Sequence, residues 1–325
     1  MATKDEILKI LEKNGSTFTS GEEMASTLYL TRAAVWKGIK ALEKAGHKIE
    51  AVTNKGYRLV RNAPAVDVNE LRALIDTDRE FDIFTFDETE STNDSALEYA
   101  RKNPGREAVF IADRQTKGRG RRGREFYSPK DTGLYMSFLI YPKVSFEEAA
   151  SFTCLTAVAL CEAIKEALNV DTGIKWVNDI FLGDKKVAGI LTEGIASVED
   201  RKFSHAVIGA GINIYDPYEG FPGTLKKTAG FLLKESTGEN VRLKLAAAFI
   251  NRLFERLSEP ALSFCGDYRK LSILTGKYVR VENFTGEKPK YALVTGIDDN
   301  CRLLVRYEDG REEALSSGEV SVKKY

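Results

Sequence analysis

Residues 118–124 read GRGRRGR, a run of four arginines and three glycines without an acidic residue. Arginine guanidiniums form paired hydrogen bonds with carboxylates and phosphates, and glycines let backbone N–H groups approach an anion closely. The run therefore predicts an anion-binding loop, and because its charges repel one another we expect it to order on its ligand. A solvated surface loop is the alternative. No aromatic residue in the run could stack on single-stranded nucleic acid.

The loop does not match the common nucleotide-binding motifs. Gly118 and Gly123 stand where a P-loop has its outer glycines, but Arg-Glu follows in place of the required Lys-Ser/Thr. A second glycine run, GAGIN at 209–213, has Ile214 at the position of the third glycine of a dinucleotide fingerprint. The anion is therefore not bound through either motif.

Two further runs, KWVND at 175–179 and KKVAG at 185–189, place lysines near an aspartate. A Gly-Asp turn between them predicts a β-hairpin in which 181 pairs with 186 and 179 pairs with 188. The side chains of Lys175, Asp179 and Lys186 then share one face, with the asparagine of KWVND on the other, unless a bulge alters the register.

Such a face suits a reaction that brings two anions together. A carboxylate approaching a nucleotide phosphate meets a repulsion of about 4 kcal/mol per charge pair at 4 Å and an effective dielectric of 20. Lysines and Mg²⁺ offset this repulsion and stabilise the charge that develops in nucleotidyl transfer. The alternative is a lysine-rich surface turn, but Trp176 and Val177 indicate a half-buried strand.

Composition narrows the classes of protein. A chain of 325 residues suggests two or three domains. Its only histidines, His47 and His205, exclude histidine-rich metal sites, and the four scattered cysteines form no zinc or disulfide pattern. No apolar run reaches the length of a membrane span and the first residues lack a signal-peptide core, so we expect a cytoplasmic protein.

Residues 1–64 are predicted to form a winged helix-turn-helix domain. Helical periodicity covers 4–13, a helix begins after Ser20, another follows Thr31 and ends at Gly46, and a hairpin comes next. Residues 1–65 carry 11 Lys and Arg against 7 Asp and Glu, a net charge of +4. The basic residues gather on the third helix and the hairpin, which favours DNA binding over a merely solvated basic helix. The predicted DNA-binding residues are Thr31, Arg32, Trp36, Lys37, Lys40, Lys55 and Arg58.

The rest of the chain is predicted to form an α+β fold and a small barrel. After a linker around Pro64, residues 65–272 mix hairpins with helices, which favours a mixed sheet over regular βαβ units. A strand at 173–182 and a buried helix at 146–168 belong to this domain. Residues 273–325 contain five short strands, typical of a closed, SH3-like β-barrel.

Taken together, the motifs resemble those of biotin–protein ligases. STN at 91–93, GRGRRGR, KWVND, KVAG and GAGIN occur in the order and spacing of that family, and the winged helix in front resembles its bifunctional type, which is also the repressor of the biotin operon. Val177 stands where the family usually has proline, and we expect no loss of chemistry from this.

The resemblance implies a two-step reaction. Biotin and MgATP give biotinyl-5′-AMP and pyrophosphate, and a lysine of the biotin carboxyl carrier protein then attacks the mixed anhydride. Biotin binding is assigned to Ser91, Thr92, Asn93, Gln115, Arg119, Arg121, Lys186 and Gly189. ATP binding is assigned to Arg119, Arg121, Arg124, Lys175, Asn178 and Asn213, metal binding to Asp179, and catalysis to Lys186, Arg121, Asp179 and Lys175.

The resemblance also implies regulation. Residues 216–231 would close over biotinyl-5′-AMP, which would act as corepressor by favouring a homodimer that presents two winged helices to operator DNA. Two other interpretations stay open: a transcription factor that only senses a small molecule, and a lipoate–protein ligase. The arginine loop argues against both, and the DNA-binding segment argues against the second.

Overall fold

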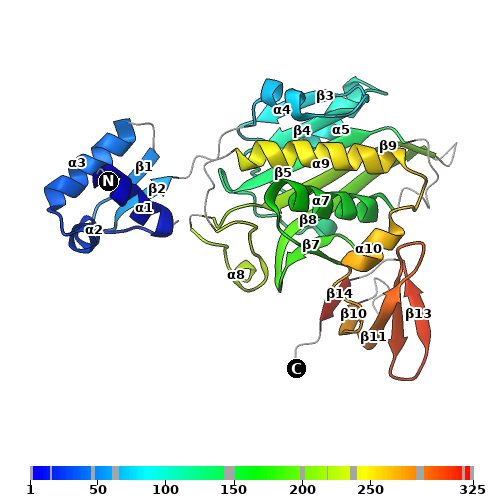
Figure 1. Ribbon diagram of the computed structural model, residues 1–325. Helices are drawn as coiled ribbons and strands as arrows, with labels where there is room; N and C mark the ends of the chain where they lie inside the picture. Colours follow the sequence, from blue (N-terminus) through cyan, green and yellow to red (C-terminus); the bar gives the residue numbers. More distant parts are fainter. Residues whose placement is uncertain are drawn as a thin grey trace.

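The computed structural model describes residues 3–14, 17–44, 48–60, 66–142, 151–197, 202–217, 219–234, 240–282, 289–316 and 319–322. These residues form an N-terminal helical module with a two-stranded sheet, a central seven-stranded sheet covered by helices, and a C-terminal five-stranded sheet (Figure 1). No helix in this part of the chain has the length and apolar character needed to span a bilayer.

The N-terminal module has the predicted order of elements. They are α1 (Thr3–Asn14), α2 (Gly21–Leu28), α3 (Arg32–Lys44), β1 (Lys48–Val52) and β2 (Gly56–Val60). Both helix starts follow from local capping: Ser20 Oγ accepts a hydrogen bond from Glu23 N at 3.0 Å, and Thr31 Oγ1 accepts one from Ala34 N at 3.2 Å. The predicted helix end at Gly46 lies outside the described residues.

The hairpin of this module is tied to the segment before α2. Asn54 and Gly56 take the left-handed conformations that its turn requires. A Cβ at Gly56 would overlap the Thr19 carbonyl, and Thr19 and Tyr57 exchange backbone hydrogen bonds of 2.8 and 2.9 Å. The wing is therefore fixed in position against the helices.

The central unit has a mixed sheet, as predicted. Its strands lie in the order β3-β4-β5-β9-β8-β7-β6, and among the described strands β3 and β4 are the one parallel pair. The strands are β3 (Asp82–Phe86), β4 (Ala108–Ala112), β5 (Gly133–Ile140), β6 (Gly173–Lys175), β7 (Asp179–Leu182), β8 (Lys185–Ser197) and β9 (Lys202–Asn213). The helices are α4 (Val68–Leu74), α5 (Thr92–Lys102), α7 (Phe152–Leu168), α8 (Leu225–Thr228), α9 (Val241–Ser258) and α10 (Cys265–Leu271), with a 3₁₀ turn η1 (Arg121–Gly123).

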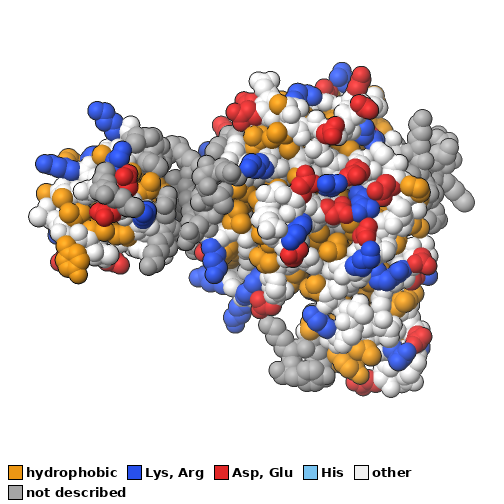
Figure 2. Space-filling view, in the orientation of Figure 1, with side chains coloured by type: hydrophobic (Ala, Val, Ile, Leu, Met, Phe, Trp, Pro, Cys, Tyr) orange, Lys and Arg blue, Asp and Glu red, His pale blue; other side chains and the backbone are white. Residues whose placement is uncertain are grey.

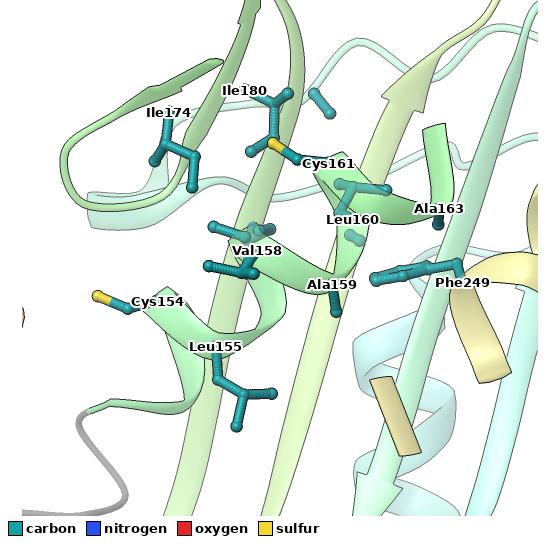
Figure 3. Packing of buried hydrophobic residues seen from close by; sticks show 14 of the residues in the cluster. Cys154, Leu155, Val158, Ala159, Leu160, Cys161, Ala163, Ile174, Ile180 and Phe249 are labelled. Carbon is teal, nitrogen blue, oxygen red and sulfur yellow. The ribbon is translucent and has the colours of Figure 1, made fainter. Parts of the chain in front are cut away.

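Helices cover both faces of this sheet. Val109 and Ile111 of β4 belong to the large core under α7 and α9, whereas Ala108 and Phe110 belong to the core under α5. Figure 1 shows α9 and α7 side by side in front of the sheet. The buried helix predicted from its apolar circumference is confirmed over 152–168, and its side chains pack toward the strands and α9 (Figure 3).

One predicted strand is wrong in an instructive way. The run 173–182 is not continuous: β6 ends at Lys175, residues 176–178 form a turn, and β7 returns antiparallel to β6. The turn is held by distant groups, because the indole Nε1 of Trp176 donates to the Cys301 carbonyl and the hydroxyl of Tyr268 donates to the Val177 carbonyl, each at 3.0 Å. Tertiary hydrogen bonds thus override the strand pattern.

The register of the neighbouring hairpin also differs from the prediction. Residue 181 pairs with 186 as expected, but a bulge follows and residue 179 pairs with 189 instead of 188.

The C-terminal unit contains the five predicted strands. They are β10 (Tyr278–Glu282), β11 (Lys290–Ile297), β12 (Leu303–Tyr307), β13 (Glu312–Leu315) and β14 (Glu319–Val322). All pairings are antiparallel in the order β13-β12-β11-β10-β14. Within the described residues β13 and β14 are the two edges and do not pair, so the closed barrel stays a prediction. The buried residues of these five strands belong to the same hydrophobic core as those of the central unit.

Candidate active site

A cavity of about 670 Å³ lies beside the start of α5 and over the β9–β8–β7 part of the sheet. This is the size of small-molecule sites in enzymes. Every residue that the sequence assigned to biotin, ATP, metal or catalysis lines it: Ser91, Thr92, Asn93, Gln115, Arg119, Arg121, Arg124, Lys175, Asn178, Asp179, Lys186, Gly189 and Asn213. Five separate motifs therefore converge on one site.

One end of the cavity is a buried, uncharged hydrogen-bonding cluster. The Oε1 atom of Gln115 accepts from Thr92 N at 2.9 Å and from Thr92 Oγ1 at 3.1 Å, and its Nε2 donates to Ser128 Oγ at 3.1 Å. Ser137 Oγ lies 2.6 Å from both Thr92 Oγ1 and Asn93 Oδ1. Hydroxyl and amide groups so placed suit a neutral polar ligand group.

Glycines give the cavity a flat floor. Gly189 and Gly211 pair across β8 and β9, and the ring of Phe126 lies against them, 3.5 Å from the position of a Cβ at Gly189. A Cβ at Gly211 would overlap this ring, and one at Gly209 would overlap the amide of Asn93. The glycines of GAGIN and KVAG thus let side chains lie directly on the sheet.

The other end of the cavity holds the lysine and aspartate. Lys186 Nζ lies 2.6 Å from Asp179 Oδ1, so the predicted pairing of these side chains across the hairpin occurs despite the bulge. Lys175 lies opposite Asp179 on β6, with its Nζ 5.7 Å from the centre of the Phe181 ring. A cation held by one carboxylate is in position to exchange it for a substrate anion.

The arginine loop forms a tight turn over the cavity. Gly120 N donates to the Arg124 carbonyl at 2.7 Å, and Phe126 N donates to the Gly118 carbonyl at 2.8 Å. Arg122 and Gly123 have positive φ angles of 61° and 68°. The structure gives the loop a defined conformation, and its ordering on ligand binding stays a prediction.

Two arginines of this loop have different partners. Arg121 Nη1 donates to Asn178 Oδ1 at 3.1 Å, and Asn178 is itself anchored to the carbonyl of Ile190 at 2.8 Å. Arg119 forms a bidentate ion pair with Asp94, at 2.5 and 2.7 Å, and lies 3.5 Å from Glu193. These acids raise the pKa of Arg119, the hydrogen bond to Asp94 contributing most.

The segment after β9 returns to the cavity. Asn213 Nδ2 donates to the Gly230 carbonyl at 3.0 Å, and Gly230 N donates to the Lys186 carbonyl at 2.8 Å. The ring of Phe221 meets that of Tyr127 edge to face, with centroids 6.5 Å apart. Burial raises the pKa of Tyr127.

Sequence reasoning missed three kinds of lining residue. The aromatic rings of Phe126 and Tyr127 follow the arginine loop directly, so proximity to the motif could have found them. Phe221 could have been found as an aromatic residue within the Gly/Pro-rich segment. Ser321 comes from β14 and Lys277 directly precedes β10, and no local signal connects either residue to the site.

The cavity contains little that would hold a metal on its own. Among the described residues there is no group of three or more His, Cys, Asp or Glu side chains able to bind an ion. Asp179 is the carboxylate in contact with Lys186, and a single carboxylate together with substrate phosphates fits the way Mg²⁺ is bound in nucleotide sites.

The predicted DNA-binding residues lie on α3, at Thr31 just before it, and on the wing, remote from the cavity in the sequence. Arg32 and Lys37 are exposed on α3, and Trp36 between them is 52% exposed. Lys40 pairs with Glu43 at 2.6 Å. Figure 2 shows basic side chains projecting from this module.

The wing residues are more constrained. Arg58 pairs with Glu50 at 2.6 Å and stacks on the ring of Phe18, 4.6 Å from its centre, and Lys55 lies 6.0 Å from the same centre.

Comparison with known proteins supplies three matching family models. The chain matches the HTH domain at residues 3–58, the biotin/lipoate A/B protein ligase family at 85–213 and the biotin protein ligase C-terminal domain at 275–323.

Individual relatives match over longer stretches. The bifunctional ligase/repressor BirA of Bacillus subtilis (strain 168) is 32% identical over 320 residues, 97% of each chain. The biotin–[acetyl-CoA-carboxylase] ligase of Paracoccus denitrificans is 36% identical over 232 residues, 69% of this chain and 94% of that one. The solved biotin protein ligase from Aquifex aeolicus in complex with biotin and ATP has a TM-score of 0.59 at 25% identity, covering 75% of this chain and 99% of that one.

Proposed function

The chain belongs to the family of bifunctional biotin protein ligases and biotin repressors, and from this premise we propose how its residues perform the two roles. It is a biotin–[acetyl-CoA-carboxylase] ligase with a DNA-binding repressor module. One observation supports the proposed site most strongly: Thr92 with Gln115, Arg121 with Asn178, and Lys186 with Asp179 line a single cavity.

In the first step, the carboxylate oxygen of biotin attacks the α-phosphorus of ATP and pyrophosphate leaves. The uncharged cluster around Thr92 and Gln115 binds the ureido end of biotin, and this places its carboxylate toward the charged end of the cavity. Lys186 exchanges Asp179 for the biotin carboxylate, and Arg121 contacts the α-phosphate. Two cations at this point offset a repulsion of about 4 kcal/mol per charge pair.

The reaction would require the Mg²⁺ ion that accompanies ATP. Asp179 is the protein ligand we propose for it, and Lys175, Asn178, Arg124 and Asn213 contact the rest of the nucleotide. When bound, the ion neutralises phosphate charge and so supports departure of pyrophosphate.

In the second step, the amine of a lysine on the biotin carboxyl carrier protein attacks the acyl carbon of biotinyl-5′-AMP, and AMP leaves. Until the carrier arrives, the adenylate has to be shielded from water. The segment 216–231 provides this cover, since Phe221 already packs on Tyr127 and Gly230 is bonded to the Lys186 backbone.

Biotinyl-5′-AMP also acts as corepressor. By ordering the segments over the cavity it favours a homodimer, which presents two α3 helices to a palindromic operator. Sedimentation of the protein with and without biotin and ATP tests this: we expect dimers only with both, and unchanged association would contradict it.

Three further features belong to the same proposal. The five C-terminal strands close into an SH3-like barrel, domain boundaries lie near 64 and 272, and the protein acts in the cytoplasm, where ATP and operator DNA are found. The alternating burial of β10 and β12 supports the barrel, since one face of each strand is enclosed.

The deciding experiment is exchange of labelled pyrophosphate into ATP with biotin as the only added acid. We expect exchange that depends on biotin and is not supported by lipoate. Operator binding without exchange would favour a sensor-type transcription factor, and exchange with lipoate would favour a lipoate–protein ligase.

A further inference from the structure

Arg119, one of the cations that line the cavity, is held by two acids. Both of its terminal nitrogens bond to Asp94, at 2.5 and 2.7 Å, and Nη2 also lies 3.5 Å from Glu193 Oε2. A bidentate arginine–carboxylate pair is among the strongest side-chain hydrogen-bonding arrangements. The guanidinium fork that would bind a substrate carboxylate is therefore already occupied.

The charge balance points the same way. One guanidinium between two carboxylates carries a local net charge of −1, so it offers no excess positive charge to an anion. Arg121 has the opposite character: its partner is the neutral amide of Asn178, and no carboxylate pairs with it in the described part of the chain. Only one of these two arginines keeps its charge available.

The acids that hold Arg119 do not line the cavity themselves. Arg119 and Asn93 are among the described lining residues, whereas Asp94 and Glu193 are not. Asp94 is in the first turn of α5, where a negative charge is favourable to the helix. Glu193 belongs to β8 and accepts a hydrogen bond of 2.6 Å from Asn93 Nδ2.

This arrangement joins three parts of the fold. Asn93 is 5% exposed, its oxygen lies 2.6 Å from Ser137 Oγ, and Gly209 leaves no spare room beside it. Any shift of the arginine loop therefore displaces Glu193 or Asp94, and through them the neutral cluster at the start of α5.

We propose that Asn93, Asp94, Arg119 and Glu193 form an ionic latch, and that Arg119 is a positioning residue for the biotin end of the cavity and does not bind the substrate anion. The latch fixes the first part of the arginine loop to α5 and β8, so that Arg121 alone of the pair contacts the reacting groups. The inference rests on the proposed biotin site and specifies how it is held.

The rival possibility is that Arg119 releases Asp94 and binds the carboxylate of biotin. The two possibilities predict opposite effects of Asp94→Asn. If Arg119 is a latch residue, the substitution loosens the biotin end. If Arg119 binds the anion, the substitution frees the guanidinium and leaves biotin binding unchanged or tighter.

The test measures binding of biotin and of biotinol, the alcohol analogue without a carboxylate, to the full chain by calorimetry. Arg119→Gln and Asp94→Asn are each expected to lower the affinity for both ligands to the same extent, about tenfold. The double variant is expected to bind them no more weakly than the single variant with the lower affinity. The KM for ATP in the exchange assay is expected to stay at the wild-type value. Glu193→Gln, which can still accept from Asn93, should weaken both ligands less.

Arg121→Gln provides the contrast, with a raised KM for ATP. Thermal unfolding of each variant shows whether it is folded. If Arg119→Gln is unstable, Arg119→Lys replaces it, because lysine keeps the positive charge but not the two-pronged guanidinium. Arg119→Lys should weaken the binding of biotin and of biotinol equally.

Tighter or unchanged biotin binding in Asp94→Asn, or a loss confined to biotin in Arg119→Gln or Arg119→Lys, would overturn the latch. Failure of the wild-type protein to bind biotin would instead refute the proposed function.

Discussion

The cavity and helix α3 use the same residue types in opposite ways. In the cavity, Lys186 and Arg119 each contact a carboxylate at hydrogen-bonding distance. On α3, Arg32 and Lys37 extend into solvent, and no acid pairs with them in the described residues. A cation held by an acid has a fixed position, whereas a solvated cation contributes mainly its charge.

This difference has a measurable consequence. Substitutions in the cavity should be sensitive to side-chain geometry and insensitive to salt, because the groups are preorganised. Substitutions on α3 should be sensitive to charge and salt, because phosphate binding there depends on counterion release. A third arrangement joins α7, α9 and α10, where Arg256 of α9 pairs with Glu162 of α7 and with Asp267 of α10. Acidic and basic side chains are intermixed on the face of the molecule that these helices cover (Figure 2).

The largest effect is expected at Lys186. Lys186→Ala should lower biotin-dependent pyrophosphate exchange about 10²–10³-fold, since it removes a positioned cation from the reacting centre. Lys186→Arg should recover little, because the guanidinium has a different reach and shape. Lys165→Ala, a surface lysine of α7 paired with Asp171, is the matched control and should leave exchange unchanged. Near-normal exchange by Lys186→Ala would refute the assigned role.

The cavity floor should be the next most sensitive feature. In Gly209→Ala the new methyl group overlaps the Asn93 amide and must displace it from Ser137 and Glu193. We expect biotin affinity to fall about tenfold, equivalent to about 1.4 kcal/mol, as measured by calorimetry. Gly296→Ala, where a Cβ meets nothing within 4 Å, should have no such effect. Equal affinities in both variants would show that the floor is less rigid than its contacts indicate.

A smaller effect is expected on α3. Lys37→Ala should weaken operator binding several-fold and reduce the salt dependence of log K by about one unit, because one phosphate contact is lost. In contrast to Lys186, replacement by arginine should restore both quantities, and ligase activity should not change. A loss of operator affinity that does not depend on salt, or failure of Lys37→Arg to restore binding, would show that Lys37 acts through a fixed geometry, as the cavity residues do.

The smallest effect concerns His205, a half-buried histidine of β9. Burial lowers the pKa of His205, so the unfolded chain binds a proton more readily than the folded one once the pH falls below about 6.5. Stability is expected to be fully present above this pH and to decrease as the pH falls toward the folded-state pKa. The thermal unfolding temperature of His205→Gln should depend less on pH between 8 and 5 than that of the wild type. Parallel curves would show that His205 is not responsible.

Features that depend on contacts between residues close in the sequence could be predicted, whereas features that depend on distant residues could not. The starts of α2 and α3 could be predicted because Ser20 and Thr31 cap helices within three residues of themselves. The turn at 176–178 could not, because it depends on Cys301 and Tyr268, 125 and 91 residues away.

The site shows the same limit. The lining residues that belong to a motif could be predicted because those motifs carry the chemistry in their residue types. The partners of Arg119 could not, because Asp94 lies in a helix and Glu193 in a strand without a motif of its own. The bulge after residue 186 has no local signal either, yet it leaves Lys186 and Asp179 in contact.

A crystal structure of the protein with biotinyl-5′-AMP tests the central claim most directly. The account predicts the phosphate within hydrogen-bonding distance of Arg121 and Lys186, with the ureido group facing Thr92 and Gln115. An adenylate bound away from the arginine loop, or bound in the reverse direction with its ureido group at Lys186, would contradict it.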